Sequence, residues 1–231
     1  MLKVLRREEK YPIQLQEALS YNDYFSKLLS HDSHSKNGAY AVRSLYFDTI
    51  DDKDFYNKIT EQNTRRKIRL RIYHPQDQYA KLEMKKKENI YQEKRSLLIT
   101  REDAQSIING NLSVLLKYPE DFAAELYCVM STEFYRPKSI VEYQRRAFMA
   151  KENHIRLTFD TMITGTESNF DLFSENLPLT PIYDPNNAIF EVKYDKFLLG
   201  YISEIISNIN RRNISCSKYC LSRSIGCGDY I

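Results

Sequence analysis

The sequence predicts an α+β fold, in which about eight antiparallel strands with helical insertions form a closed β-barrel or a large antiparallel sheet. Apolar and charged residues alternate with period two in several segments, and segments with helical spacing of apolar residues separate them. Of the 231 residues, 42% are hydrophobic and 28% charged, which is typical of a folded protein. With 6 glycines and 7 prolines there is little material for a linker, so we expect a single domain over residues 1–231.

The period-two pattern predicts strands along most of the chain. They lie at residues 2–11, 40–47, 65–73, 79–87, 91–99, 139–151, 154–163 and 188–194. A short polar segment around Pro75 separates the third strand from the fourth and is suited to a hairpin loop. This spacing indicates antiparallel pairing.

Apolar residues with helical spacing, together with start signals, predict helices between these strands. The helices cover about residues 12–31, 52–59, 100–109, 119–130 and 195–210. Pro12 begins the first helix, at the position where a helix tolerates proline. Asp51 or Asp52 caps the second, and Thr100 with Asp103 resembles a capping box for the third. The apolar stripes of these helices can cover one side of a sheet.

Each predicted strand carries charged side chains on one face, because successive residues of a strand point to opposite sides. The charged faces hold Arg6, Glu8 and Lys10; Lys67, Arg69 and Arg71; Lys81, Glu83 and Lys85; Tyr143 and Arg145; Arg156, Thr158 and Asp160; and Glu191 and Lys193. For any one strand, a solvated outer face is the simpler interpretation. Taken together, the faces are nearly all Arg, Lys and Glu. We therefore expect them inside a closed eight-stranded barrel, with the helices packed outside.

A barrel lined in this way predicts an anionic guest, because enclosed cations are costly when they are unpaired. The charged faces hold more bases than acids. A phosphate chain fits them, since it is linear, highly charged and matched to Arg and Lys donors. Glu8, Glu83 and Glu191 are then explained as oxygen ligands of a Mg²⁺ or Mn²⁺ ion that bridges the phosphates.

The sequence excludes several other classes of protein. No apolar run approaches the roughly 20 residues of a membrane span, and the amino terminus lacks the apolar segment of a signal peptide, so a cytoplasmic protein is expected. The four cysteines lack the paired spacing of a zinc site, and no phosphate-binding glycine loop or dinucleotide motif is present.

Eight short segments carry a resemblance to a known family. They are residues 6–11, 44–49, 67–73, 82–85, 143–148, 156–160, 191–194 and 217–219. In this order the segments resemble the VTC domain, the polyphosphate polymerase branch of the triphosphate tunnel metalloenzymes (CYTH-like superfamily). The sister branch of thiamine-triphosphatase and adenylate-cyclase type usually begins with Glu-x-Glu-x-Lys. Arg6 replaces the first Glu here, which favours the polymerase branch.

The resemblance implies a tunnel fold in which basic side chains bind phosphate and acidic ones bind a metal. The implied phosphate-binding residues are Lys10, Arg69, Arg71, Lys85, Lys94, Arg95, Arg145, Arg156, Lys193 and Lys218. The residues expected to act in catalysis are Lys10, Arg69, Arg71, Arg145 and Arg156. Glu191 is the implied main ligand of Mn²⁺ or Mg²⁺, with Glu83 and Glu8 in support.

The function predicted first is that of an ATP-polyphosphate phosphotransferase, which moves the γ-phosphoryl group of ATP onto a growing polyphosphate chain. The alternative is a metal-dependent triphosphatase or polyphosphatase on the same fold. A module that binds RNA or another polyanion through residues 65–71 is a third interpretation, but Glu8, Glu83 and Glu191 would repel a nucleic-acid backbone, so no nucleic acid is expected. A membrane partner protein is possible, although the chain has no predicted membrane segment.

Overall fold

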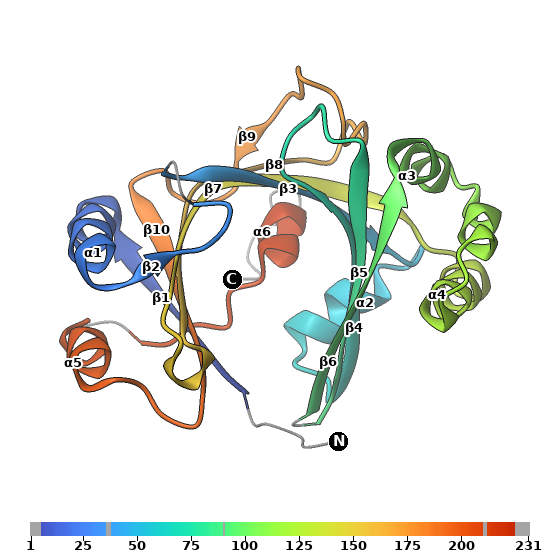
Figure 1. Cartoon of the computed structure of the whole chain (residues 1–231). Coiled ribbons are helices and arrows are strands. Elements are labelled where there is room, and N and C mark those ends of the chain that lie inside the picture. Colours follow the sequence, from blue (N-terminus) through green and yellow to red (C-terminus); the bar gives the residue numbers. More distant parts are fainter. Residues whose placement is uncertain (1–5, 36–37, 90, 210–211, 225–231) are drawn as a thin grey trace. The chain divides into compact units, whose positions relative to one another are not determined.

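The computed structural model describes residues 6–35, 38–89, 91–209 and 212–224, and it has the mixed α+β composition expected from the sequence (Figure 1). The strands are β1 (Arg6–Gln14), β2 (Ser30–His31), β3 (Tyr40–Asp48), β4 (Thr64–Ile72), β5 (Tyr79–Glu88), β6 (Tyr91–Thr100), β7 (Arg136–Met149), β8 (Arg156–Thr166), β9 (Thr180–Pro181) and β10 (Asn187–Asp195). The helices are α1 (Leu15–Leu28), α2 (Lys53–Ile59), α3 (Arg101–Ile108), η1 (Leu112–Lys117), α4 (Asp121–Thr132), η2 (Glu152–His154), α5 (Gly200–Asn208) and α6 (Lys218–Ser224).

The strands form a large antiparallel sheet. In the described part of the chain its order is β1-β10-β8-β7-β3-β4-β5-β6, with β2 beside β7 and β9 beside β8. The order begins at β1 and ends at β6, and hydrogen bonds do not close it, so the predicted closed barrel is not shown. Alternation along a strand specifies which side chains share a face. It carries no information on whether the first and last strands pair, because the backbone donors and acceptors are the same in every strand.

The first helix begins later than the sequence pattern predicts. Pro12 lies inside β1, opposite Ile189 of β10, and α1 starts at Leu15. Since β1 is the first strand of the order, a residue without a backbone N–H is tolerated there. The Gln14 backbone N–H donates to the Glu17 side chain at 2.7 Å, which fixes the first turn of the helix.

The last predicted helix is also shorter than expected. Residues 195–199 are not helical, and α5 covers Gly200–Asn208, because Asp195 still belongs to β10. The short helix α6 was not predicted. Its seven residues are too few for a periodic pattern, and its buried residues Tyr219 and Leu221 are held by tertiary contacts.

The chain forms two compact units, each made of separate segments. Unit 1 comprises Met1–Ala41, Tyr143–Ile163 and Tyr183–Cys216. Unit 2 comprises Val42–Glu142, Thr164–Ile182 and Ser217–Ile231. Strands β3, β7 and β8 have residues in both units. The single domain expected from the sequence stays a prediction.

Unit 1 has an aromatic core between its strands and two helices. The rings of Phe159 and Phe190 stack with centroids 4.6 Å apart, and Phe25 of α1 lies within 6.3 Å of both. Ile202 brings α5 to the same core. Figure 1 shows α1 beside β1 and β10. Because these apolar side chains alternate with charged ones, the charged face of the strands points away from α1 and α5.

Unit 2 has an aliphatic core with the same organisation. Ile68 and Leu70 of β4 and Leu82 of β5 are fully buried. Helices α3, η1 and α4 cover them, with Leu126 of α4 fully buried in the same cluster. Figure 1 shows α3 and α4 beside β6. The charged residues that alternate with this core therefore occupy the opposite face of β4 and β5.

Candidate functional site

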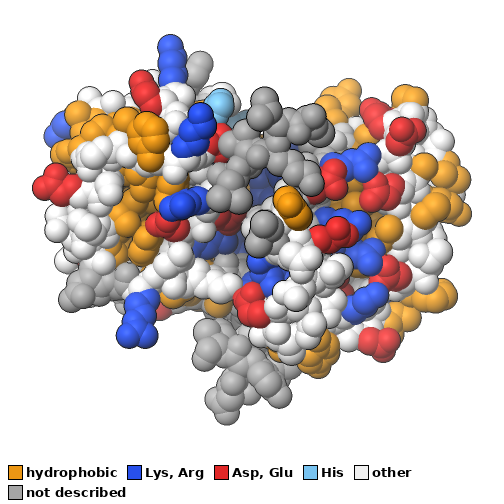
Figure 2. Space-filling view, turned by 90° about the horizontal axis from the view of Figure 1, so that it is seen from below, with side chains coloured by type: hydrophobic (Ala, Val, Ile, Leu, Met, Phe, Trp, Pro, Cys, Tyr) orange, Lys and Arg blue, Asp and Glu red, His pale blue; other side chains and the backbone are white. Residues whose placement is uncertain are grey.

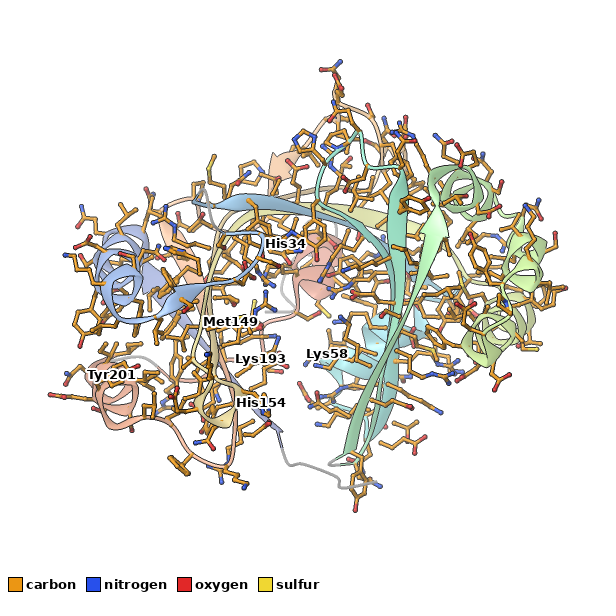
Figure 3. The ribbon with its side chains drawn as sticks, viewed as in Figure 1. His34, Lys58, Met149, His154, Lys193 and Tyr201 are labelled. Carbon is orange, nitrogen blue, oxygen red and sulfur yellow. The ribbon has the colours of Figure 1, made fainter. Side chains whose placement is uncertain are left out.

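The strand register of unit 1 brings predicted site residues from three strands together. Glu8 of β1 lies opposite Lys193 of β10, and Lys10 lies opposite Glu191. Lys193 is also opposite Arg156 of β8. In Figure 3, Lys193 lies on the other side of the strands from α1 and α5. These five side chains share one face, and we call them the unit 1 cluster.

Lys10 lies between the two carboxylates of the unit 1 cluster. Its Nζ is 3.1 Å from Glu8 Oε1 and 3.6 Å from Glu191 Oε2. It also donates to the backbone carbonyl of Cys216 at 3.1 Å. Burial lowers the pKa of Lys10, but Glu191 and Glu8 outweigh burial and raise the pKa above its ordinary value. Lys10 is therefore charged at any physiological pH.

Arg145 is fixed by a buried bidentate ion pair. Its Nε and Nη2 donate to the two carboxylate oxygens of Asp160 at 2.6 and 2.7 Å, and Asp160 is fully buried. The guanidinium carbon lies 5.1 Å from the centre of the Tyr143 ring. Burial lowers the pKa of Arg145, yet Asp160 more than offsets this, and the pKa lies well above the ordinary value. Asp160 uses two of the five guanidinium donors, so Arg145 is positioned to offer others to an anion.

Arg156 is oriented by a residue that the strand pattern does not reveal. Its Nη2 donates to Asp32 Oδ2 at 2.8 Å, and Tyr40 Oη donates to the same oxygen at 3.1 Å. Burial raises the pKa of Asp32, but Arg156 and the Ser35 backbone N–H outweigh it, so the pKa lies below its ordinary value. Asp32 lies in a polar loop before β3. The alternation of side chains along a strand makes no prediction for a loop residue.

The unit 1 cluster has donors suited to a divalent metal that also binds phosphate. Glu8 and Glu191 both lie within 3.6 Å of Lys10 Nζ and therefore close to each other. Mg²⁺ and Mn²⁺ in phosphate sites are commonly held by one or two carboxylates, with phosphate and water oxygens completing the shell. Among the residues that the structure describes, no group of three or more His, Cys, Asp or Glu side chains is placed to hold a metal alone. The two-carboxylate arrangement fits a metal shared with a phosphate ligand.

The unit 2 cluster is built on β4, β5 and β6, around a single carboxylate. Arg69 of β4 lies opposite Glu83 of β5, and Arg69 Nε donates to Glu83 Oε2 at 2.7 Å. Arg71 Nη1 lies 3.8 Å from the same oxygen, and Lys94 of β6 pairs with Glu83 Oε1. We define the cluster as Lys67, Arg69, Arg71, Lys81, Glu83, Lys85 and Lys94.

Glu83 stays ionised because of the cations around it. It is 3% exposed. Burial alone would raise its pKa, but Arg69, Arg71 and Lys94 outweigh burial and lower the pKa to about 2. Both oxygens of Glu83 contact cations, as both oxygens of Glu191 do, and the supporting metal role that the resemblance implies for Glu83 stays a prediction.

A row of lysines crosses the same face of unit 2. Lys67 of β4 lies opposite Lys85 of β5, which lies opposite Lys94 of β6. Lys67 Nζ donates to Ser217 Oγ at 2.7 Å, at the start of α6. Lys218, the next residue, is half-buried. The structure thus brings four of the lysines singled out from the sequence into unit 2.

Arg95 lies on the opposite face from the unit 2 cluster. It is opposite Met84 in the β5–β6 ladder and pairs with Glu125 of α4. Its guanidinium carbon is 4.5 Å from the centre of the Phe122 ring. Adjacent strand residues face opposite ways, so Lys94 and Arg95 cannot both join one cluster. The structure places the Arg95 side chain against α4, away from the predicted phosphate-binding residues of β4 and β5.

Two tyrosines support the unit 2 cluster and were not singled out from the sequence. Arg69 Nη1 donates to Tyr46 Oη at 3.3 Å, and the Tyr46 ring stacks on Tyr219 of α6. Burial raises the pKa of Tyr46, but Arg69 and the neighbouring cations outweigh it and lower the pKa. Tyr219 Oη donates to the fully buried Asp48 at 2.6 Å, which holds α6 on this face. Period-two parity along β3 places Tyr46 and Asp48 on one face, a signal that could have identified both.

Beyond these clusters, ion pairs are common on the surface. On the face shown in Figure 2, Lys and Arg side chains adjoin Asp and Glu side chains. Within the described chain, no helix is both long and apolar enough to span a membrane. The side chain of Arg6, predicted on the charged face of β1, lies outside the described residues.

The fold is similar to that of solved proteins. A candidate adenylate cyclase from Bacillus halodurans is 10% identical, with 93% of each chain covered and a TM-score of 0.52. A candidate adenylyl cyclase from Hippeastrum, HpAC1, described as having a dominant triphosphatase activity, is 12% identical, with 94% of each chain covered and a TM-score of 0.56. No curated protein matches the sequence.

The antiparallel sheet, with helices on its apolar faces and Arg, Lys and Glu on its charged faces, has the same fold as these solved proteins. Residues 5–225 match the VTC domain family. The chain belongs to this family, as the resemblance of its short segments predicts.

Proposed function

We propose that this protein is a metal-dependent polyphosphate polymerase, which transfers the γ-phosphoryl group of ATP to the end of a polyphosphate chain. The observation that carries the proposal is the composition of the unit 2 cluster. Its β4 and β5 strands place Lys67, Arg69, Arg71, Lys81 and Lys85 on one face against the single acid Glu83. Such a surplus of positive charge suits a ligand with several adjacent negative groups, and a phosphate chain has this property.

The basic side chains have defined roles in this proposal. Phosphoryl transfer passes through a loose transition state, so positioning and charge neutralisation supply most of the catalysis. Arg69 and Arg145 are each oriented by a carboxylate, and they would present their remaining donors to phosphate oxygens in a fixed direction. Within unit 1, Lys10, Lys193 and Arg156 would also bind phosphate groups. No nucleophilic side chain is required, because the acceptor is itself a phosphate.

Glu191 and Glu8 would hold the divalent metal in unit 1. The Glu191 side chain is 6% exposed and that of Glu8 is 22% exposed, so both carboxylates remain partly screened from water. A bound Mn²⁺ or Mg²⁺ would neutralise charge on the phosphate oxygens. Lys10 and Lys193, which contact both carboxylates, would keep them ionised and oriented.

A triphosphatase is the second candidate function. The protein HpAC1, with a similar fold, is described as having a dominant triphosphatase activity, which supports this alternative. The same basic side chains would bind a triphosphate in either reaction. The two functions differ in the acceptor, which is water in one and phosphate in the other, and so in how well water is excluded from the bound phosphates.

A product assay separates the two functions. The purified full chain is incubated with ATP and Mn²⁺, and the products are resolved on a polyphosphate gel while free phosphate is measured in parallel. The polymerase function predicts a ladder of long, phosphatase-sensitive products that is absent when EDTA is added. Release of free phosphate without long products would overturn the polymerase proposal and leave the triphosphatase.

A further inference from the structure

Unit 1 has a cavity on the helical side of its strands, away from the charged cluster. It lies between α1 and α5 and has a volume of about 390 Å³. Three tyrosines line it, Tyr21 and Tyr24 from α1 and Tyr201 from α5, together with Glu204 and Ile205. Figure 3 shows Tyr201 projecting from α5. This volume is in the range of small-molecule sites.

The tyrosine rings of this pocket are held in place by the aromatic core. Tyr21 stacks on Phe190 with centroids 6.3 Å apart, and Tyr24 meets Phe25 edge to face at 5.5 Å. Tyr201 and Ile205 are partly buried against the same core. Rings fixed in this way are preorganised, so a ligand would not have to order them on binding.

The electrostatic environment of the pocket is negative. Glu204 lies on its wall, and among the described residues that line the pocket none is a lysine or an arginine. Burial raises the pKa of Tyr21, and the nearby carboxylate of Glu17 raises it further. Burial and then Glu152 raise the pKa of Tyr201. Two carboxylates outside the lining thus add to the negative field of Glu204.

We propose that this pocket binds an organic ammonium ion, with the cation over the tyrosine rings and beside Glu204. The faces of aromatic rings carry partial negative charge, and several rings around one cavity are suited to a quaternary or primary ammonium group. An anion or a phosphate chain would be repelled there, so the pocket does not serve the ligand proposed for the charged clusters. The inference therefore does not depend on the proposed function.

Choline and its neutral isostere 3,3-dimethylbutan-1-ol provide the test, because they share a shape and differ in charge. Binding of each to the full chain is measured by calorimetry and by ligand-observed NMR. Choline should bind saturably, and the neutral isostere should bind at least about fivefold more weakly.

Single substitutions test whether the binding occurs in this pocket. Tyr201→Leu removes the ring while keeping bulk, and we expect it to weaken choline binding about fivefold. Glu204→Gln changes an exposed side chain that does not support the fold, and it should weaken binding in the same direction. Tyr79→Leu, at an exposed tyrosine of β5, is the matched control and should leave binding unchanged.

Three outcomes would overturn the proposal. They are the absence of saturable choline binding to the unmodified chain, equal binding of the neutral isostere, and binding that neither Tyr201→Leu nor Glu204→Gln weakens. None of them bears on phosphate chemistry, which the ATP product assay measures separately.

Discussion

Unit 1 and unit 2 both carry basic side chains on the charged faces of their strands, but these side chains are paired with carboxylates differently. In unit 1, each described basic residue of the proposed site has a carboxylate partner: Lys10 and Lys193 contact Glu191, Arg145 contacts Asp160, and Arg156 contacts Asp32. In unit 2, three cations share Glu83, and three further lysines lie on the same face of the strands.

The difference predicts a separate role for each cluster. A balanced cluster can be stable without a ligand, and its carboxylates can bind a metal. A cluster with surplus positive charge is destabilised by repulsion among its own cations, and an anion relieves this. We therefore expect the unit 1 cluster to determine metal dependence and the unit 2 cluster to determine affinity for phosphate.

The largest expected effect is a loss of turnover when Glu191 of the unit 1 cluster loses its charge. Glu191→Gln should lower metal-dependent ATP turnover by about 10³-fold, because the main proposed metal ligand loses its charge. Tripolyphosphate binding should be kept, since the unit 2 cluster is intact. Glu93→Gln, at an exposed position of β6, is the control and should have no effect. If Glu191→Gln turns over ATP at nearly the rate of the unmodified chain, the unit 1 cluster does not hold the catalytic metal. A protein that only binds polyanions would keep or gain affinity and would show no turnover to lose.

The second prediction concerns stability and the balanced pairing of unit 1. Arg145→Gln should lower the free energy of unfolding by about 4 kcal/mol, because it leaves the fully buried Asp160 without its bidentate partner. Urea unfolding followed by circular dichroism measures this change. Restoring stability with the second substitution Asp160→Asn would identify the unpaired charge as the cause. If Arg145→Gln is as stable as the parent, the pairing does not stabilise unit 1.

The third prediction tests the shared carboxylate of unit 2. The pKa of Glu83 is about 2, against an ordinary value of 4.5, a difference that corresponds to about 3 kcal/mol. Glu83→Gln should therefore lower the free energy of unfolding by about this amount at pH 7. Tripolyphosphate should recover much of the loss, since an anion can replace the missing charge. A loss that tripolyphosphate does not recover would argue against a phosphate site in unit 2.

The same carboxylate gives a pH dependence with a definite sign. Because the pKa of Glu83 is lowered by folding, its contribution is complete above about pH 4.5 and is lost as the pH falls towards 2. The difference in stability between the parent chain and Glu83→Gln should be constant from pH 7 to about 5 and shrink below that. Acid unfolding of the two proteins in parallel measures it. A difference that stays constant down to pH 2 would contradict the assigned pKa.

The smallest expected effect is a loss of affinity for tripolyphosphate when one cation of the unit 2 cluster is removed. Arg71→Gln should weaken tripolyphosphate binding about tenfold while changing the free energy of unfolding little, because Glu83 keeps Arg69 and Lys94. Arg95→Gln is the matched control, since Arg95 lies on the other face of the strands against α4. Calorimetric titration with tripolyphosphate distinguishes them. Equal losses from both substitutions would mean that strand parity does not define the binding face.

Local pattern was sufficient for most of the strands and for the composition of their charged faces. The ladder of β4, β5 and β6 has the parity expected from the sequence, with Arg69 and Glu83 opposite each other and Leu70 and Leu82 on the buried face. Local pattern does not place Pro12 correctly, because proline is equally compatible with the first turn of a helix and with a strand paired on one side. The orientation of Arg95 follows from strand alternation, although resemblance alone placed it among the phosphate-binding residues.

The sequence by itself determined the α+β class, the family and the charged faces, because alternation and short motifs are properties of neighbouring residues. Only the tertiary structure decided which charges are paired. Asp32 reaches Arg156 across 124 residues of sequence, and Tyr219 reaches Asp48 across 171. Such contacts depend on strand register and on the packing of loops and helices, which no local pattern encodes. The contrast between a balanced unit 1 cluster and a cationic unit 2 cluster is therefore a property of the folded chain.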